Sequence, residues 1–139
     1  MNQGEENRKL RVLFVDDSDY VLQSLRRMLW ELRDVCDMEF AGEGAQALAL
    51  HRQRRFDVIV VDLQMPVMDG WELLEGVRSA DPAVRCFVLA GNPSPADVTK
   101  AVGLGYGLIE KPCSPVSLKA AIFGRSNEGR DSVPRREGE

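Results

Sequence analysis

Short apolar runs alternate with amphipathic stretches along most of this chain, and the alternation limits the folds that it can adopt. We expect β-strands at residues 11–15, 38–41, 58–61, 86–89 and 107–109. The third run, Val58-Ile-Val-Val61, consists of β-branched residues only, which suits a strand buried on both faces. Strands that alternate with helices form parallel sheets covered by helices on both sides. The sequence therefore predicts a doubly wound α/β domain.

Helices are expected between these strands and after the last one. After Ser18, apolar residues recur at three- and four-residue steps as far as Leu32, which predicts an amphipathic helix. Further helices are expected at residues 45–50, 71–77, 98–102 and 118–122. Asp69, Ser94 and Ser114 are the expected N-caps of the last three, because short polar side chains accept hydrogen bonds from the first free N–H groups of a helix.

Isolated aromatic residues and the single histidine have ordinary structural interpretations. Trp30 and Trp71 lie within helical stretches and are expected to pack in the core. His51 stands among Arg52, Arg54 and Arg55, so we expect it on the surface and not at a metal site. Cys86 is expected to be a core residue of its strand.

The length and charge of the chain exclude several classes of protein. Its 139 residues fit one domain, and a net charge of −4 disfavours direct binding of nucleic acid. No apolar stretch is long enough to span a membrane. The three cysteines are widely spaced, which favours a reduced, cytoplasmic protein. Composition predicts a disordered N-terminal tail at residues 1–8, a domain at 9–123, and a mobile tail or linker at 124–139.

Charged side chains stand where three of the expected strands end. Asp16 and Asp17 follow the first run, Asp62 follows the third, and Lys111 follows the last. The carboxyl ends of parallel strands meet at one edge of the sheet, where ligands bind. Clustered carboxylates repel one another unless a cation neutralises them, and hard oxygen ligands suit Mg²⁺. These residues predict a magnesium site for phosphoryl chemistry with one aspartate as nucleophile.

Two other motifs favour different chemistry but fit less well. Gly42-Glu-Gly44 with Ala47 matches a dinucleotide fingerprint, yet it follows the second strand, so a turn into the next helix is the preferred interpretation. A haloacid-dehalogenase phosphatase needs a second aspartate two residues after its nucleophile. Gln64 stands there instead.

The three charged segments, in this order and spacing, resemble the receiver domain of two-component response regulators. The matching pieces are Val15-Asp-Asp-Ser18, Asp62-Leu-Gln-Met-Pro-Val-Met-Asp-Gly70 and Glu110-Lys-Pro112, and the resemblance covers residues 9–123. It implies a CheY-like fold with five parallel strands in the order 2-1-3-4-5.

The resemblance also implies a role for each site residue. Asp62 would accept a phosphoryl group from a phosphohistidine on a sensor kinase or phosphotransfer protein. Asp17 and Asp62 would bind Mg²⁺ directly, together with the backbone carbonyl of Gln64, while Asp16 would bind through water or position the ion. Lys111 would pair with a phosphoryl oxygen, and its peptide bond to Pro112 would be cis. Such a domain catalyses only its own phosphorylation and dephosphorylation.

Two positions depart from the pattern of this family. Relatives carry Thr or Ser where this chain has Ala90, and an aromatic residue where it has Leu108. A hydroxyl bonded to a charged phosphoryl oxygen contributes roughly 1.5–3 kcal/mol, which Ala90 cannot supply. We expect the metal and acceptor chemistry to persist while the structural response is smaller or uses a different route. Asn92, beside Gly91, is a candidate phosphoryl contact, and Gln64 and Asn92 stand where relatives tune the attack of water.

The predicted function is a phosphoacceptor switch in a His-to-Asp relay. It would act through the face formed by the expected helix at 98–102, the strand at 107–109 and the helix at 118–122, which could meet an output domain or a second copy. The run Cys36–Gly42, together with Lys111-Pro-Cys113, resembles receivers that precede HDOD or HD-type output domains. The alternative is an interaction or dimerisation module that binds its partner whatever its phosphorylation state.

Overall fold

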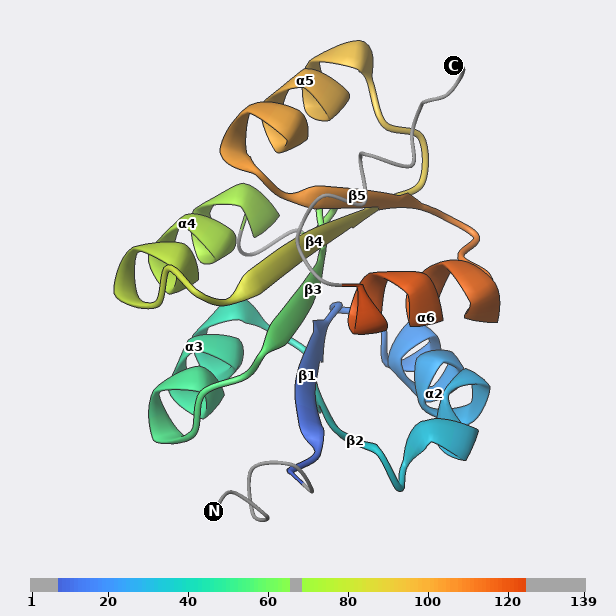
Figure 1. The fold of residues 1–139 in the computed structure, drawn as a ribbon. Coiled ribbons are helices and arrows are strands. Elements are labelled where there is room, and N and C mark those ends of the chain that lie inside the picture. The colour runs from blue at the N-terminus through green and yellow to red at the C-terminus, as the bar shows by residue number, and fades with distance from the viewer. Residues whose placement is uncertain (1–7, 66–68, 125–139) are drawn as a thin grey trace.

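The computed structural model describes residues 8–65 and 69–124, and its centre is a parallel five-stranded sheet (Figure 1). The strand order is β2-β1-β3-β4-β5, as predicted. The strands are β1 (Leu10–Val15), β2 (Cys36–Ala41), β3 (Val58–Asp62), β4 (Arg85–Ala90) and β5 (Gly107–Glu110). Each expected strand is confirmed, and each extends beyond the predicted run by one residue or more.

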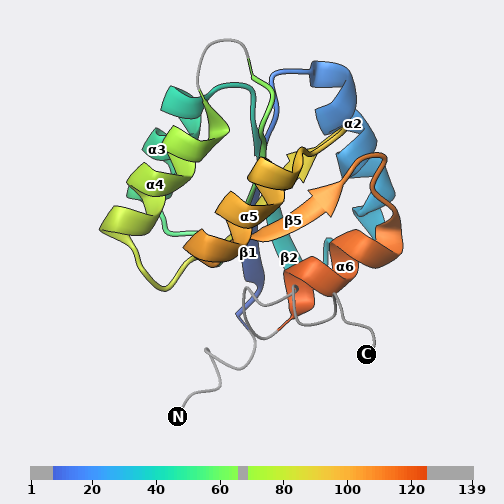
Figure 2. The same cartoon turned by 90° about the horizontal axis from the view of Figure 1, so that it is seen from above.

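Helices cover both faces of this sheet, which Figure 2 shows from above. They are α2 (Asp19–Met28), α3 (Gly44–Gln53), α4 (Gly70–Ala80), α5 (Pro95–Leu104) and α6 (Pro115–Phe123), with a short 3₁₀ helix η1 (Trp30–Leu32) after α2. On one face Leu22 and Leu25 of α2 and Leu118 of α6 pack against the sheet. On the other face the sheet packs against Ala47 of α3 and Leu74 of α4, among others.

Alternation along the strands divides the core in two. In β1, Val12 and Phe14 face the α2 and α6 side, whereas Leu13 and Val15 face α3 and α4. All four side chains are at most 1% exposed. Burying apolar side chains on both faces of a strand requires the continuous apolar run that the sequence shows.

Helix starts follow the capping signals of the sequence. The side chains of Ser94 and Ser114 accept hydrogen bonds from the backbone N–H groups of Asp97 and Ser117, and a proline follows each cap. The Asp69 carboxylate accepts from the Trp71 N–H, 3.0 Å away. The predicted N-caps are therefore confirmed, and Gly44 begins α3, as the turn interpretation of Gly42-Glu-Gly44 required.

Some apolar side chains of the helices are exposed to solvent. Trp30 is 56% exposed in η1, because α2 ends before it and the chain turns. Val98 and Val102 of α5 are also exposed, and only Ala101 of that helix is buried. The expectation that Trp30 packs in the core was therefore wrong.

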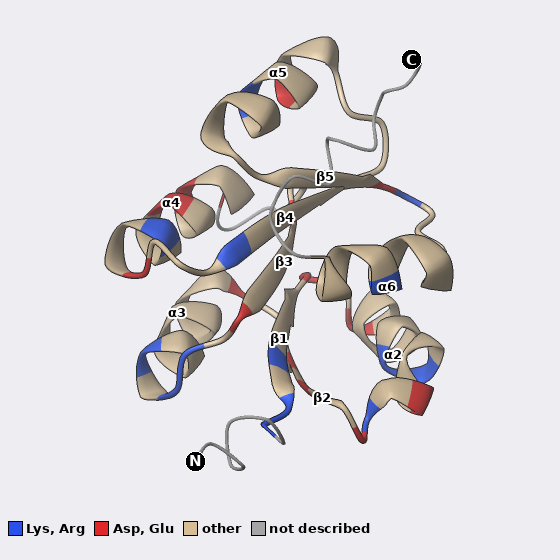
Figure 3. Ribbon diagram, viewed as in Figure 1, with Lys and Arg blue, Asp and Glu red and all other residues tan. Residues whose placement is uncertain are grey.

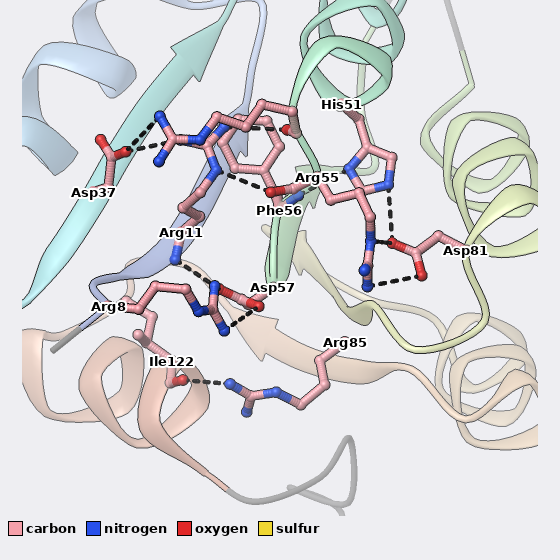
Figure 4. Close-up of polar contacts among 11 residues, drawn as sticks. Arg8, Arg11, Asp37, His51, Arg55, Phe56, Asp57, Asp81, Arg85 and Ile122 are labelled. Carbon is pink, nitrogen blue, oxygen red and sulfur yellow. Dashed lines mark hydrogen bonds and ion pairs between the residues drawn. The ribbon is translucent and has the colours of Figure 1, made fainter. Parts of the chain in front are cut away.

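His51 was also placed wrongly by the sequence, because it is 5% exposed. The Phe56 backbone N–H donates to its Nδ1 (3.1 Å), and its Nε2 lies 3.3 Å from an Asp81 carboxylate oxygen (Figure 4). Burial lowers the pKa of His51, although the Asp81 carboxylate opposes the shift. Asp81 is in turn bound by Arg55, from the connection that precedes β3.

Arginines hold the strands together at their N-terminal ends. Figure 3 shows basic residues at the start of β1 and on the chain after α3. Arg11 is 4% exposed and donates to the carbonyls of Arg54 and Arg55, while its guanidinium lies 4.3 Å from the centre of the Phe56 ring. Arg85 at the start of β4 donates to the carbonyl of Ile122 and so fixes the end of α6 (Figure 4). This network stands at the edge opposite the charged residues predicted to form the site.

The predicted tails lie mostly outside the described residues. Arg8 and Gly124 are described, and Arg8 forms an ion pair with Asp57 at 3.1 Å. Residues 66–68, in the middle of the second resemblance segment, are also outside the described part. Among the helices that the structure describes, none has the length and apolar character to cross a membrane.

Candidate functional site

Three carboxylates meet at the C-terminal edge of the sheet. Strands β1 and β3 are neighbours with Val15 opposite Val61, so the residues that follow both strands lie side by side. Ligand oxygens of Asp16, Asp17 and Asp62 all lie within 4.8 Å of one another. Asp16 and Asp62 are buried and Asp17 is exposed. The structure therefore brings together the three acids that the sequence singled out.

Lys111 reaches this cluster from the end of β5. Its backbone N–H donates to the carbonyl of Ala90 at 2.8 Å, which continues the pairing of β4 with β5. Its Nζ lies 3.0 Å from Asp62 Oδ1 and 3.9 Å from Asp16 Oδ2, so only the first contact is a hydrogen bond. The Lys111–Pro112 peptide bond is cis, as the resemblance implied.

The two buried carboxylates are bonded differently. Asp62 Oδ1 accepts both from Lys111 and from the Gln64 backbone N–H at 3.1 Å. Asp16 Oδ1 accepts from the Ser18 N–H at 2.9 Å, but its Oδ2 is buried without a hydrogen-bond partner among the described residues. A buried, unpartnered carboxylate oxygen is costly unless a cation or water satisfies it.

Burial raises the pKa of Asp16 from 3.8 to about 6. The negative charges of Asp62 and Asp17 act in the same direction, while the Ser18 N–H and Lys111 oppose the shift. A divalent cation would reverse this balance, because it favours the charged form of every carboxylate around it. Three clustered carboxylates and one unpartnered oxygen fit a hard cation such as Mg²⁺.

A glycine brings the start of α4 against Asp62. A Cβ atom on Gly70 would lie 2.8 Å from the Asp62 carbonyl oxygen, which is closer than Cβ atoms approach in proteins. Only glycine allows α4 to begin so near the end of β3. Gly70 ends the second resemblance segment, but this contact was not predicted from the sequence. A glycine directly after a helix cap was the available signal.

The two atypical positions lie beside the site and within the core. Ala90 is 3% exposed at the end of β4, and Leu108 is partly buried in β5 against the core between the sheet and α3 and α4. Gly91 and Asn92 follow β4 and are exposed, and a Cβ on Gly91 would lie 3.8 Å from the Gln64 side-chain oxygen. A contact from Asn92 to a phosphoryl group stays a prediction.

Sequence reasoning missed one aromatic pair near the site. Trp71, in the first turn of α4, stacks on Tyr106 with ring centroids 6.3 Å apart and planes 18° apart. Tyr106 is 4% exposed. It precedes β5 in a glycine-rich turn, so no periodic pattern marked it as a core residue.

Comparisons with known proteins agree with this arrangement. A family model described as the response regulator receiver domain matches residues 12–123. A protein-glutamate methylesterase/protein-glutamine glutaminase of Bacillus licheniformis is 32% identical over 111 residues, which are 78% of this chain and 31% of the relative. A response regulator receiver protein of Anaeromyxobacter sp. (strain Fw109-5) is 35% identical over 108 residues, which are 78% of this chain and 44% of the relative. The chain thus spans less than half the length of these two relatives.

A solved structure supports the same family. The chemotaxis protein CheY4 of Vibrio cholerae superposes with a TM-score of 0.75 at 32% identity, over 82% of this chain and 96% of that one. The similarity therefore includes the fold as well as the sequence. Because the family model covers residues 12–123, this chain belongs to the response regulator receiver domain family of two-component signalling.

Proposed function

We propose that Asp62 accepts a phosphoryl group from the phosphohistidine of a sensor histidine kinase or phosphotransfer protein, in a Mg²⁺-dependent reaction in the cytoplasm. The observation that supports this most is the environment of the acceptor. Lys111 Nζ lies 3.0 Å from Asp62 Oδ1, and the unpartnered Asp16 Oδ2 is buried beside it. This arrangement supports joint action of a nucleophile, a cationic side chain and an acidic metal site, since the ligand oxygens of the three acids lie within 4.8 Å of one another.

The reaction needs no further co-reactant. A carboxylate oxygen of Asp62 attacks phosphorus, the P–N bond breaks, and its electron pair returns to the imidazole of the donor while the new P–O bond forms an acyl phosphate. In hydrolysis, water attacks phosphorus, the P–O bond to Asp62 breaks, and inorganic phosphate and the free carboxylate result. The domain is therefore a phosphoacceptor that turns itself off, and we assign it no other enzymatic activity.

Positioning and charge account for most of the catalysis of phosphoryl transfer. Asp16, Asp17 and Asp62, with the backbone carbonyl of Gln64, are the proposed ligands. A bound Mg²⁺ neutralises charge on the phosphoryl oxygens. The hydrogen bond from the Lys111 ammonium to Asp62 Oδ1 supports a pairing of this lysine with one of those oxygens.

Phosphorylation is proposed to change how the face of α5, β5 and α6 meets a partner. Several apolar side chains of α5 and α6 are exposed: Val98, Val102, Leu104, Val116 and Phe123. Exposed apolar groups on one face favour a protein partner. An output domain or a second copy of the chain are the proposed occupants, since the methylesterase relative is a longer protein than its matching part.

The absence of a hydroxyl at Ala90 and of an aromatic ring at Leu108 supports a second function. In it, the domain binds its partner in one state, independent of phosphorylation. The two functions differ in whether partner binding or dimerisation responds to the phosphoryl group, so a comparison of sedimentation with and without beryllofluoride separates them. An unchanged sedimentation and partner affinity would favour the second.

The first function is tested by incubating the protein with phosphoramidate and Mg²⁺ and measuring intact mass. We expect one labile phosphoryl adduct on Asp62 that disappears in Asp62→Asn and with EDTA. Asp57→Asn is the matched control, because Asp57 is a carboxylate that binds Arg8 and the Arg11 N–H away from the site. No adduct at saturating donor and Mg²⁺ would refute the proposal.

Asn92 provides a narrower test of the phosphoryl contact. If its amide donates to the phosphoryl group, Asn92→Ala changes the lifetime of the adduct. An unchanged lifetime would remove Asn92 from the site.

A further inference from the structure

A row of stacked side chains connects α4, α5 and the start of β5. Trp71 of α4 and Tyr106, just before β5, are stacked with ring centroids 6.3 Å apart. The Lys100 ammonium of α5 lies 4.7 Å from the centre of the Trp71 ring, and the Arg78 guanidinium of α4 lies 5.4 Å from that of Tyr106. Cations over aromatic faces are attracted by the ring quadrupole, so each contact favours this arrangement.

The Trp71 end of this row is fixed to the acceptor strand. Gly70 lies so close to the Asp62 carbonyl that a Cβ atom would be 2.8 Å from it. The next residue is Trp71, whose backbone N–H is bonded to the Asp69 cap. Because the backbones of Gly70 and Asp62 are closely packed, a displacement of the Asp62 backbone also moves the first turn of α4.

The Tyr106 end is fixed both to α5 and to the lysine of the site. The Tyr106 N–H donates to the Ala101 carbonyl of α5 at 2.9 Å. Strand β5 follows at once and ends at Glu110, after which Lys111 is hydrogen-bonded to Asp62 at 3.0 Å. The Trp71–Tyr106 pair is therefore connected to Asp62 in two ways, through Gly70 at the start of α4 and through β5 and Lys111.

We propose that the Trp71–Tyr106 pair transmits the state of the Asp62 site to α5. This inference rests on the proposed function, since it assigns the route by which phosphorylation changes the partner face. Ala90 and Leu108 lack the hydroxyl and the ring that relatives carry there, whereas the Trp71–Tyr106 pair contacts elements on both sides of the site.

The change at the site has a direct physical cause. A phosphoryl group on Asp62 brings negative charge that attracts the Lys111 ammonium group. Lys111 directly follows β5, so a movement of its backbone also moves this strand. A shift of β5 moves Tyr106, which is 4% exposed and packed against Trp71. Helix α5 follows, because it is bonded to Tyr106 through Ala101 and held to Trp71 through Lys100. The exposed Val98 and Val102 of α5 then change their position relative to β5 and α6.

The experiment measures two quantities on each protein. Intact mass after phosphoramidate treatment reports the adduct at Asp62, and amide hydrogen exchange of residues 95–104, with and without Mg²⁺ and beryllofluoride, reports the response of α5. The variants are Trp71→Leu, Tyr106→Leu and the double replacement. Trp30→Leu is the matched control, because Trp30 is the other tryptophan and is exposed in η1, far along the chain from this row.

We expect wild type and Trp30→Leu to form the adduct and to change exchange in α5. Trp71→Leu and Tyr106→Leu should form the adduct to within about twofold, while the α5 response falls at least about threefold, the size of a typical coupling along a packed network. The double variant should lose no more than either single one, because both side chains belong to one contact. Tyr106→Phe keeps the aromatic ring and should show the same change of hydrogen exchange in α5 as wild type.

Each outcome has a separate meaning. No adduct in wild type would overturn the proposed function and this inference with it. An adduct in wild type with an undiminished α5 response in Trp71→Leu would overturn the inference alone. Loss of the adduct in a folded Trp71→Leu protein would also overturn it, since the pair would then act on the site and not between the site and α5. If Tyr106→Leu does not fold, the inference is still tested by Trp71→Leu, which changes a half-buried residue, and by the conservative Tyr106→Phe.

Discussion

Replacing Asp16 with asparagine should stabilise the metal-free protein. The Asp16 side chain is buried, with one oxygen unpartnered among the described residues, and its pKa is raised to about 6 from 3.8. A difference of about 2 between the folded and unfolded pKa values corresponds to about 3 kcal/mol, at roughly 1.4 kcal/mol for each pKa unit. This is an upper value for the gain in free energy of unfolding at pH 7, because asparagine must still be accommodated in the same place.

The raised pKa of Asp16 determines how the free energy of unfolding depends on pH. Between pH 3.8 and about 6 the folded protein keeps a proton on Asp16 that the unfolded chain has lost. The contribution of Asp16 to the free energy of unfolding therefore falls as the pH rises from 3.8 to about 6. Above that window the whole contribution has been lost. Asp16→Asn removes the loss, so its advantage over wild type should be largest at pH 7 and should disappear near pH 4.

Mg²⁺ should largely cancel the advantage in free energy of unfolding that Asp16→Asn has over wild type. A ligand at 100 times its dissociation constant stabilises the folded state by about 2.7 kcal/mol, and the variant lacks one proposed ligand. Urea unfolding at pH 7 and pH 4, with EDTA and with Mg²⁺, measures all of these differences. In EDTA, Asp17→Asn is the control, since it removes the same charge from an exposed side chain and should change stability by less than about 1 kcal/mol. An Asp16→Asn protein that is no more stable than wild type at pH 7 in EDTA would refute the reasoning.

Three further substitutions test the fold around the site. Gly70→Ala should lose about 1–3 kcal/mol and slow phosphoryl acceptance because its Cβ meets the Asp62 carbonyl, whereas Gly42→Ala, with open space around it, should stay within about 0.5 kcal/mol in the same denaturant titration. Wild type should lose stability as the pH falls below 6.5, because burial lowers the pKa of His51. His51→Gln should remove this loss, and parallel plots of unfolding free energy against pH for the two proteins would contradict the prediction. Arg11→Met should cost about 3 kcal/mol by removing the donor that bonds the Arg54 and Arg55 carbonyls, and a urea-derived loss below about 1 kcal/mol would show that water replaces the guanidinium.

The candidate site was predictable because its residues are placed by strand ends. In a parallel sheet, residues that follow neighbouring strands meet at one edge whatever the helices between them do. The run Val58–Val61 and the aspartate after it were therefore enough to place Asp62 beside Asp16. Lys111 followed by the same reasoning from the last strand.

The errors concern side chains whose surroundings come from distant parts of the chain. His51 stands among arginines in sequence, yet the Phe56 N–H bonds its Nδ1 and an Asp81 carboxylate oxygen lies 3.3 Å from its Nε2, both from elsewhere in the chain. Trp30 lies within the stretch that was predicted as one helix, but α2 ends at Met28 and the ring is exposed to solvent. Periodicity predicts which face of a helix is apolar, and it does not predict where the helix ends or what covers its last turn.

The sequence alone determined the order of the elements, the two apolar faces of the strands and the carboxylates at the sheet edge, because these follow from short-range patterns of polarity and branching. Only the tertiary structure decided that one oxygen of Asp16 has no partner within residues 8–65 and 69–124, that α4 begins against the Asp62 carbonyl, and that Trp71 stacks on Tyr106. These contacts join residues from different elements, and their distances depend on how the whole core packs. A local pattern contains no information about that packing.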